Sequence, residues 1–233
     1  MSTITTTATM PARASDTARP AIDTRGHAAA TLYEAAVAVL AALPADDPIR
    51  GSFTGLFSVD PRIRAAWPGA RMAGTAFTVQ GAGGDNLALH QGVYAAPEGS
   101  ILVVDVNGAA FGHWGEVLAV AAQSRGITGL LIDGGVRDSV EQSALGFPVF
   151  SRNNSVRGTR KLVRGGLGVE VEIGGVPVRT GDTIVADADG VVVLPAEIAE
   201  AVVEQADLRV AKEESIIRRL RAGETTLEVY GLD

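Results

Sequence analysis

Hydrophobic positions divide the chain into two regions with different patterns. Up to about residue 151, continuous apolar runs typical of buried strands alternate with segments whose apolar residues have helical 3/4 spacing. We expect strands at 71–80, 101–106, within 127–136 and at 148–151, and helices at 28–43, from about 86 to 95, from 115 onward and at 138–145. This alternation predicts a layered α/β domain.

The pattern changes from about Gly165. Residues 169–173 alternate with period two, Gly174-Gly175 is typical of a hairpin, and two further short strands are expected at 183–186 and 190–194. We expect an antiparallel β lobe here, within one domain, because no linker precedes it. Pro195 then opens a long helix that runs to about Arg221.

The first 27 residues are rich in Thr, Ala and Pro and lack the apolar core of a signal peptide. We expect a disordered or loosely packed arm at 1–27, followed by one domain at 28–233. An organellar transit segment is the alternative, since arginines recur in this arm, but Asp16 and Asp23 argue against it.

Composition narrows the functional classes. A net charge of −7 argues against a protein that binds nucleic acid through its phosphates. The chain has no cysteine, which excludes disulfides and thiolate metal sites. No run is long and apolar enough to span a bilayer, so we predict a cytoplasmic protein without a membrane partner.

The most informative segment runs from Gly115 to Asp138, and twenty residues separate Glu116 from Arg137 within it. It predicts a helix that begins at the acid and a buried strand that ends at Arg137-Asp138. If the two pack antiparallel, both ends meet at the rim where open α/β sheets bind ligands. Gly134-Gly135 would let the backbone approach a ligand closely.

The residue types at this rim suit a 2-oxo acid. Asp138 directly, and Glu116 through water, could hold a hard cation such as Mg²⁺, which prefers one or two carboxylates plus waters and substrate oxygens. Arg137 suits a carboxylate or enolate oxygen, and the amides of Glu116, Val117 and Leu118 favour an anion. The alternative is that Asp138 caps the next helix and Arg137 is an ordinary surface residue.

The last predicted helix carries an acid on its apolar stripe. Glu213 shares that stripe with Val210 and Ile217, whereas Glu214 points away. A carboxylate on a buried face must be paired or meet a cation. Glu213 is therefore either salt-bridged at the edge of the stripe or enters the active site of another subunit.

These motifs resemble the RraA-like family, which includes the class II 4-hydroxy-4-methyl-2-oxoglutarate/4-carboxy-4-hydroxy-2-oxoadipate aldolases. The main match is the G-E-x20-R-D pattern ending in I-D-G-G-V-R-D, and the resemblance covers about residues 28–232. Further matching segments are P-G-A-R-M-A-G-T-A-F-T-V at 68–79, G-D-N-L at 84–87, A-L-G-F-P-V-F at 144–150, G-T-R-K at 158–161 and G-D-T-I-V-A-D-A-D-G-V-V-V-L-P at 181–195.

The resemblance implies an α/β sandwich fold related to swivelling phosphohistidine domains. It also implies homotrimers or homohexamers with active sites between subunits. Asp138 would match the metal-binding aspartate, Arg137 the pyruvate-binding arginine and Glu116 the acid that holds metal-bound water. Glu213 would match a glutamate supplied by the neighbour, and Asn86 lies in a loop that lines the family's pocket.

The chain also departs from the family pattern. Glu116 stands where the aldolases carry Asp, and residues 165–173 differ from the usual form. His113 either packs in its loop or faces the substrate, next to Gly115 at the start of the helix. His27 and His90 are expected to be structural or exposed. Lys161 and Lys212 would suit a Schiff-base aldolase, but neither lies in an apolar setting that would lower its pKa.

The sequence thus predicts a divalent-metal-dependent lyase, using Mg²⁺ or Mn²⁺, that cleaves a 4-hydroxy-2-oxo acid to pyruvate and also decarboxylates oxaloacetate. Two alternatives remain. One is a non-catalytic, protein-binding regulator of ribonuclease E type, and the other is a related lyase or isomerase in a specialised pathway.

Overall fold

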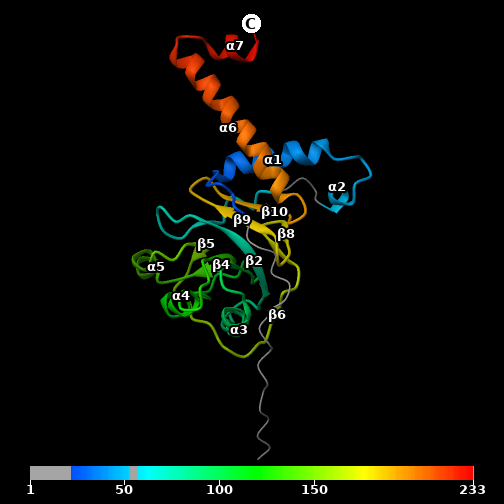
Figure 1. Cartoon of the computed structure of the whole chain (residues 1–233). Coiled ribbons are helices and arrows are strands. Elements are labelled where there is room, and N and C mark those ends of the chain that lie inside the picture. The colour runs from blue at the N-terminus through cyan, green and yellow to red at the C-terminus, as the bar shows by residue number, and fades with distance from the viewer. Residues whose placement is uncertain (1–21, 53–56, 233) are drawn as a thin grey trace, which may run out of the picture.

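A single sheet of eight strands organises the molecule (Figure 1). The computed structural model describes residues 22–52 and 57–232. The strand order is β1-β5-β4-β3-β2-β9-β10, with β6 paired to β2. The four central strands are parallel and the outer ones antiparallel. The strands of this sheet are β1 Arg64–Ala65, β2 Met72–Gln80, β3 Ser100–Asp105, β4 Gly129–Val136, β5 Val149–Asn154, β6 Gly166–Leu167, β9 Thr183–Ala186 and β10 Val191–Leu194.

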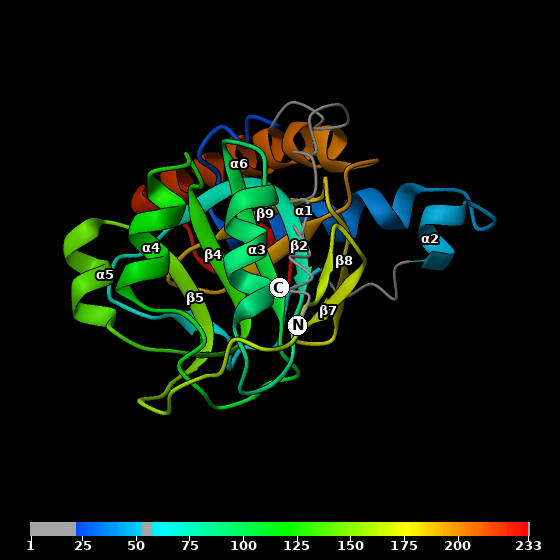
Figure 2. The same cartoon turned by 90° about the horizontal axis from the view of Figure 1, so that it is seen from below.

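Three helices cover one face of the parallel strands: α3 Leu87–Ala95, α4 Glu116–Gln123 and α5 Ser139–Leu145 (Figure 2). Side chains alternate across the sheet, so Leu130 and Ile132 pack toward these helices whereas Leu131 packs on the opposite face. β3 and β4 are buried along their whole length, which explains why both appear in the sequence as continuous apolar runs.

The opposite face packs against a small hairpin formed by β7 Val171–Ile173 and β8 Val176–Val178. β9 and β10 extend the main sheet, because β9 pairs antiparallel with β2. The strands predicted here are antiparallel and lie within one domain, as expected, but they do not form a lobe of their own. Two of the four strands belong to the same sheet as the parallel strands, and period-two alternation does not reveal which strand is the partner.

Two helices from the ends of the chain pack together over β9 and β10. They are α1 Ala29–Ala42 and α6 Ala199–Arg221, and they share a core with Val192 and Leu194. Only the first half of α6 is buried there. The second half extends beyond the body and carries α7 Thr226–Tyr230 at its tip (Figure 1).

Most predicted helices and strands agree with the observed ones to within a few residues. Between the first predicted helix and the first predicted strand, the structure also has α2 Pro48–Ser52 and the short strand β1, which the sequence did not indicate. Residues 1–21 of the predicted arm lie outside the described residues. His27 and Arg25 both pair with Asp207 of α6, so this end of the arm packs on the domain. Within the described ranges, no helix is both long and apolar enough to cross a bilayer.

Candidate active site

Asp138 lies where the end of β4 meets the start of α4. Its Oδ2 accepts a hydrogen bond from the amide of Glu116 at 3.1 Å, and Arg137 Nε is 3.5 Å from the same oxygen. Helix and strand are thus antiparallel, which is the condition under which the sequence placed their ends together, and they bring Glu116 and the Arg-Asp pair to one rim. A carboxylate at a helix N-terminus is stabilised by the free amides and the helix dipole.

The carboxylate of Asp138 does not cap the helix that follows it. Asp138 occupies the N-cap position of α5, but its side chain makes no capping hydrogen bond there. Its backbone is left-handed, with φ of 57°, a conformation that is uncommon outside glycine. Backbone hydrogen bonds hold this conformation: the Arg137 amide donates to Trp114 O at 2.8 Å, and the Gln142 amide donates to Asp138 O at 3.0 Å.

Gly115 makes this contact possible. A Cβ at position 115 would lie 2.3 Å from Asp138 Oδ2 and 3.1 Å from Arg137 Cγ. No real Cβ tolerates the first distance, so any side chain here would displace the carboxylate from the end of α4. Gly115 therefore has a steric role: because it lacks a side chain, the Asp138 carboxylate can lie at the end of α4.

Gly134 and Gly135 serve protein packing. A Cβ at 134 would lie 2.2 Å from Val106, and one at 135 would lie 2.5 Å from both Phe111 O and Asn153 Oδ1. The expectation that this pair admits a ligand is therefore wrong. The space that a side chain at 134 or 135 would need is filled by Val106 and Phe111 of the loop after β3 and by Asn153 of β5.

A pocket of about 160 Å³ opens beside Arg137. It is lined by all six residues that the sequence predicted for substrate binding, together with Gly112, His90 and Lys161. The six are Asn86, His113, Gly115, Val117, Leu118 and Arg137. A second pocket of about 440 Å³ is also lined by Arg137, together with Asp138 and Val156. Arg137 thus lines both cavities and can contact a ligand in either.

His113 is a structural residue in this protomer, although it borders the first pocket. It is fully buried, its Nε2 lies 3.0 Å from the Gly84 amide, and its Nδ1 lies 3.3 Å from Gly135 O. The amide can only donate and the carbonyl can only accept, so the ring is neutral with its proton on Nδ1. Burial lowers the pKa of His113, which agrees with this neutral form. Of the two sequence interpretations, loop packing is the one that these contacts support.

Asp85 ties two loops together at the same pocket. Its buried carboxylate accepts hydrogen bonds from the amides of Leu87 at 2.9 Å and Leu162 at 2.7 Å. Although burial acts to raise the pKa of Asp85, these and other backbone hydrogen bonds lower it overall. The next residue, Asn86, occupies the N-cap position of α3 without a side-chain capping bond. Nothing in the sequence indicated that Asp85 fixes the segment that carries Lys161.

The other predicted acids lie apart from one another. Glu116 is exposed on the first turn of α4, at the rim with Asp138. Glu213 borders neither pocket. It lies on α6, where it pairs with Arg209 at 2.9 Å and is about half exposed. Within one protomer, Glu213 is thus a surface residue, and the proposal that it enters a neighbour's site stays a prediction.

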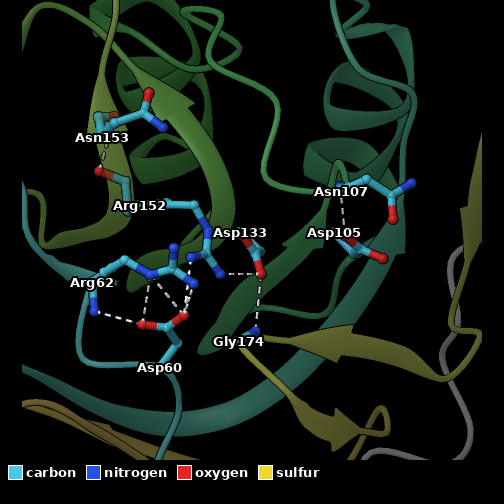
Figure 3. Close-up of polar contacts among 9 residues, drawn as sticks. Asp60, Arg62, Asp105, Asn107, Asp133, Arg152, Asn153 and Gly174 are labelled. Atoms are coloured by element: carbon cyan, nitrogen blue, oxygen red, sulfur yellow. Dashed lines mark hydrogen bonds and ion pairs between the residues drawn. The ribbon is translucent and has the colours of Figure 1, made fainter.

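A charged network supports β4 from the opposite face of the sheet (Figure 3). Arg152 of β5 contacts both carboxylate oxygens of Asp133, at 2.5 and 2.8 Å, and also Asp60 at 3.1 Å. Asp133 accepts a further bond from the amide of Gly174 in the hairpin at 2.9 Å. Hydrogen bonds from Arg62, and to a lesser extent from Arg152, hold the pKa of Asp60 below its usual range, and the hydrogen bonds to Asp133 and Asp60 raise the pKa of Arg152. Asp133, the first aspartate of the I-D-G-G-V-R-D segment, therefore stabilises the fold and faces away from Arg137.

Comparisons with known proteins agree on one family. The RraA-like model, described as Aldolase/RraA, matches residues 29–193. A protein of Halalkalibacterium halodurans named "Putative 4-hydroxy-4-methyl-2-oxoglutarate aldolase" is 34% identical over 78% of this chain and 87% of its own length.

Solved structures give the same picture. An uncharacterised protein from Pseudomonas syringae pv. tomato has a TM-score of 0.73 at 26% identity, covering 88% of this chain and 94% of its own. A Streptomyces coelicolor protein described as an unusual member of the RNase ES inhibitor RraA protein family has a TM-score of 0.65 at 27% identity, covering 86% of this chain and all of its own. On the match across most of the chain and the shared fold, this protein belongs to the RraA-like family.

Proposed function

We propose that this protein is a divalent-metal-dependent lyase that cleaves a 4-hydroxy-2-oxo acid to pyruvate and a second carbonyl compound, and that it also decarboxylates oxaloacetate. The observation that carries the proposal is the Arg137–Asp138 pair held against the N-terminus of α4, beside a pocket. The name of the Halalkalibacterium relative supports the same reaction class.

The donor set suits a hard cation that keeps most of its water. Within the described residues, no group of three or more acids and histidines could enclose a metal ion. Asp138 is partly exposed, at 37% of its side chain, and shares its rim with the exposed Glu116. Mg²⁺ needs only one or two carboxylates together with waters and substrate oxygens, so Asp138 would hold it directly and Glu116 through water. When bound, such an ion supplies Lewis-acid polarisation of the substrate's 2-oxo group.

The remaining roles fall to groups of this chain. Arg137 would bind the substrate carboxylate and stabilise the negative charge that develops on the pyruvyl oxygen as the C–C bond breaks. The amides at the start of α4 would bind the same anion. Loss of the substrate's hydroxyl proton needs a base, and a water held by Glu116 and Glu213 would serve. Replacing Arg137 by Gln would lower kcat about 100-fold, as for other donors to a developing oxyanion.

We further propose that the active site is completed in a homotrimer or homohexamer. Three valines at the site's rim are strongly exposed in the protomer: Val117 at 76%, Val140 at 76% and Val156 at 94%. Apolar side chains gathered around a polar site favour a covering chain. The half of α6 that extends from the body, with Glu213, is the segment proposed to reach a neighbour.

The central test is pyruvate release from 4-hydroxy-4-methyl-2-oxoglutarate and from oxaloacetate, with Mg²⁺ or Mn²⁺ and then with EDTA. We expect turnover that EDTA abolishes and added metal restores. Asp138→Ala should stay folded and lose this turnover, whereas Glu141→Gln, on the exposed face of α5, should keep it. Full activity of Asp138→Ala would contradict the metal site.

A second candidate is a protein-binding regulator of ribonuclease, favoured by the Streptomyces neighbour's description and by the net charge of −7, which suits a basic partner. It predicts binding of the ribonuclease with no metal-dependent turnover of any 2-oxo acid. Turnover of a different substrate class with the same Asp138 dependence would instead indicate a related lyase or isomerase.

A further inference from the structure

A third cavity, of about 360 Å³, opens at the carboxyl ends of β3 and β4, on the face of the sheet that carries the β7–β8 hairpin. Its lining residues are Arg62, Asp105, Asn107, Gly108, Asp133, Arg152 and Glu172. None of them borders either cavity beside Arg137. The proposed lyase chemistry therefore leaves this third cavity without a role.

Asp105 presents a carboxylate to this cavity that is only half paired. The residue is 9% exposed, and its Oδ1 accepts a hydrogen bond from the Asn107 amide at 2.7 Å. Among the described residues no group donates to Oδ2, yet this oxygen keeps accessible surface. Because Asp105 lines the cavity, that surface opens into it. A ligand in the cavity can therefore reach an acceptor that the protein leaves unused.

The negative charge of Asp105 is also uncompensated. Asp105 and Asp133 are register partners on adjacent parallel strands, so their side chains lie on the same face of the sheet (Figure 3). Asp133 pairs with Arg152, whereas Asp105 has no ion pair in the part of the chain that the structure describes. Burial raises the pKa of Asp105, and the nearby charges of Asp133 and Glu172 add to this effect. A buried carboxylate beside other acids is unfavourable until a cation joins it.

The two guanidinium groups of the cavity do not supply that cation. Arg62 and Arg152 are both bonded to acids other than Asp105 (Figure 3). Glu172, exposed on β7, likewise makes no ion pair with any described residue. The cavity is thus left with two carboxylates, those of Asp105 and Glu172, that have no positive partner. This charge balance favours a cationic ligand and disfavours an anion.

An ammonium group fits these surroundings better than a metal ion does. A metal ion would place its whole charge in a cavity that Arg62 and Arg152 also line. An aliphatic amine carries its charge at one end, where it offers three N–H donors, and its uncharged stem can face the guanidinium groups. Hydrogen bonds from an ammonium to a carboxylate are among the stronger ones in proteins.

We propose that this cavity binds an aliphatic amine, whose ammonium group donates to Asp105 Oδ2 and neutralises the carboxylates of Asp105 and Glu172. The amine site is separate from the proposed lyase site, so either can exist without the other.

The test titrates the full chain with putrescine, 1,4-diaminobutane, by calorimetry at constant ionic strength without added metal. We expect saturable binding by the wild type. Asp105→Asn keeps the shape of the side chain and should weaken binding at least about tenfold, the loss of one charged hydrogen bond. Glu172→Gln should weaken it less. Two controls should bind as the wild type does: Glu170→Gln, which removes an exposed charge outside the cavity, and Asp138→Ala.

Urea unfolding separates ligand binding from a structural role. Putrescine should raise the urea midpoint of the wild type and leave that of Asp105→Asn unchanged, because a ligand stabilises only the protein that binds it. If Asp105→Asn fails to fold, Glu172→Gln decides, since its exposed side chain can be replaced safely. It should bind putrescine more weakly than Glu170→Gln, and equal affinities would overturn the proposal.

Three further outcomes would overturn it. The first is no saturable binding by the wild type, and the second is equal affinity of the wild type and Asp105→Asn. The third is displacement of putrescine by Mg²⁺ in Asp138→Ala, which would assign the cavity to a metal ion. Absence of turnover with 2-oxo acids would instead contradict the lyase proposal, and it would leave these binding measurements unaffected.

Discussion

At the scale of single residues, the candidate site depends on steric and hydrogen-bond details as much as on charge. Asp138 adopts a left-handed backbone and faces the end of α4. That arrangement is possible because position 115 has no side chain. Asp138 can thus take its position only because the small residue Gly115 leaves room for its carboxylate.

Gly115→Ala tests this dependence. The added Cβ would lie 2.3 Å from Asp138 Oδ2, so we expect a folded protein whose metal-dependent turnover falls at least about tenfold, as for a misplaced catalytic group. Gly158→Ala is the matched control, because its Cβ would meet nothing within 4 Å and its φ is ordinary. Equal activity of the two variants would show that the Asp138–Glu116 contact is unimportant.

His113 makes stability depend on pH. Its folded-state pKa is lowered by burial, so the unfolded chain binds the proton more readily. The folded protein should therefore have its full stability above the unfolded pKa of about 6.5 and lose stability as the pH falls below it. We expect a lower urea midpoint at pH 5 than at pH 7.5, and a smaller difference in His113→Gln.

At the scale of helices and strands, β4 is held from both faces. α4 and α5 pack on one side, and the Asp60–Arg152–Asp133 network joins β4, β5 and the β7–β8 hairpin on the other. The strand therefore delivers Arg137 and Asp138 from a rigid support, which suits a site whose ligand contacts must be preformed.

Arg152→Met should destabilise the fold by about 3 kcal/mol, because Asp133 would remain buried without its cation. Urea unfolding followed by circular dichroism measures this change. Adding Asp133→Asn should recover part of the loss. Arg62→Gln should have a much smaller effect, since that side chain is 74% exposed. A large effect from Arg62→Gln and none from Arg152→Met would contradict the importance of the buried pair.

At the scale of the whole molecule, the protomer separates the acids that the sequence grouped. Asp138 lies on one side of the sheet body, whereas Glu213 lies on α6, which packs on α1 and then extends away (Figure 1). One chain therefore offers an incomplete set of acids, and a shared site between subunits is the arrangement that would unite them.

Mixing two inactive variants tests the shared site. Asp138→Ala and Glu213→Ala should each lack turnover, and refolding them together should restore up to about a quarter of wild-type activity, since random pairing places both native acids at that share of heterologous interfaces. Glu214→Ala, next to Glu213 but on another face of α6, should be active alone. No recovery in the mixture, with oligomers present by native mass spectrometry, would contradict a shared site.

The sequence by itself determined the order and type of most helices and strands, because fully buried strands and one-sided helices leave clear hydrophobic periods. It also determined that Glu116 and Arg137-Asp138 meet, since an antiparallel helix and strand of these lengths bring their ends together. Only the tertiary structure decided that β9 and β10 join the main sheet and that Asp133 faces away from the site. It also decided that backbone groups of Gly84 and Gly135 occupy both ring nitrogens of His113, and that Asn86 Oδ1 has no donor among the described residues. These features depend on atoms far apart along the chain, and local pattern carries no record of which distant group supplies or withholds a hydrogen bond.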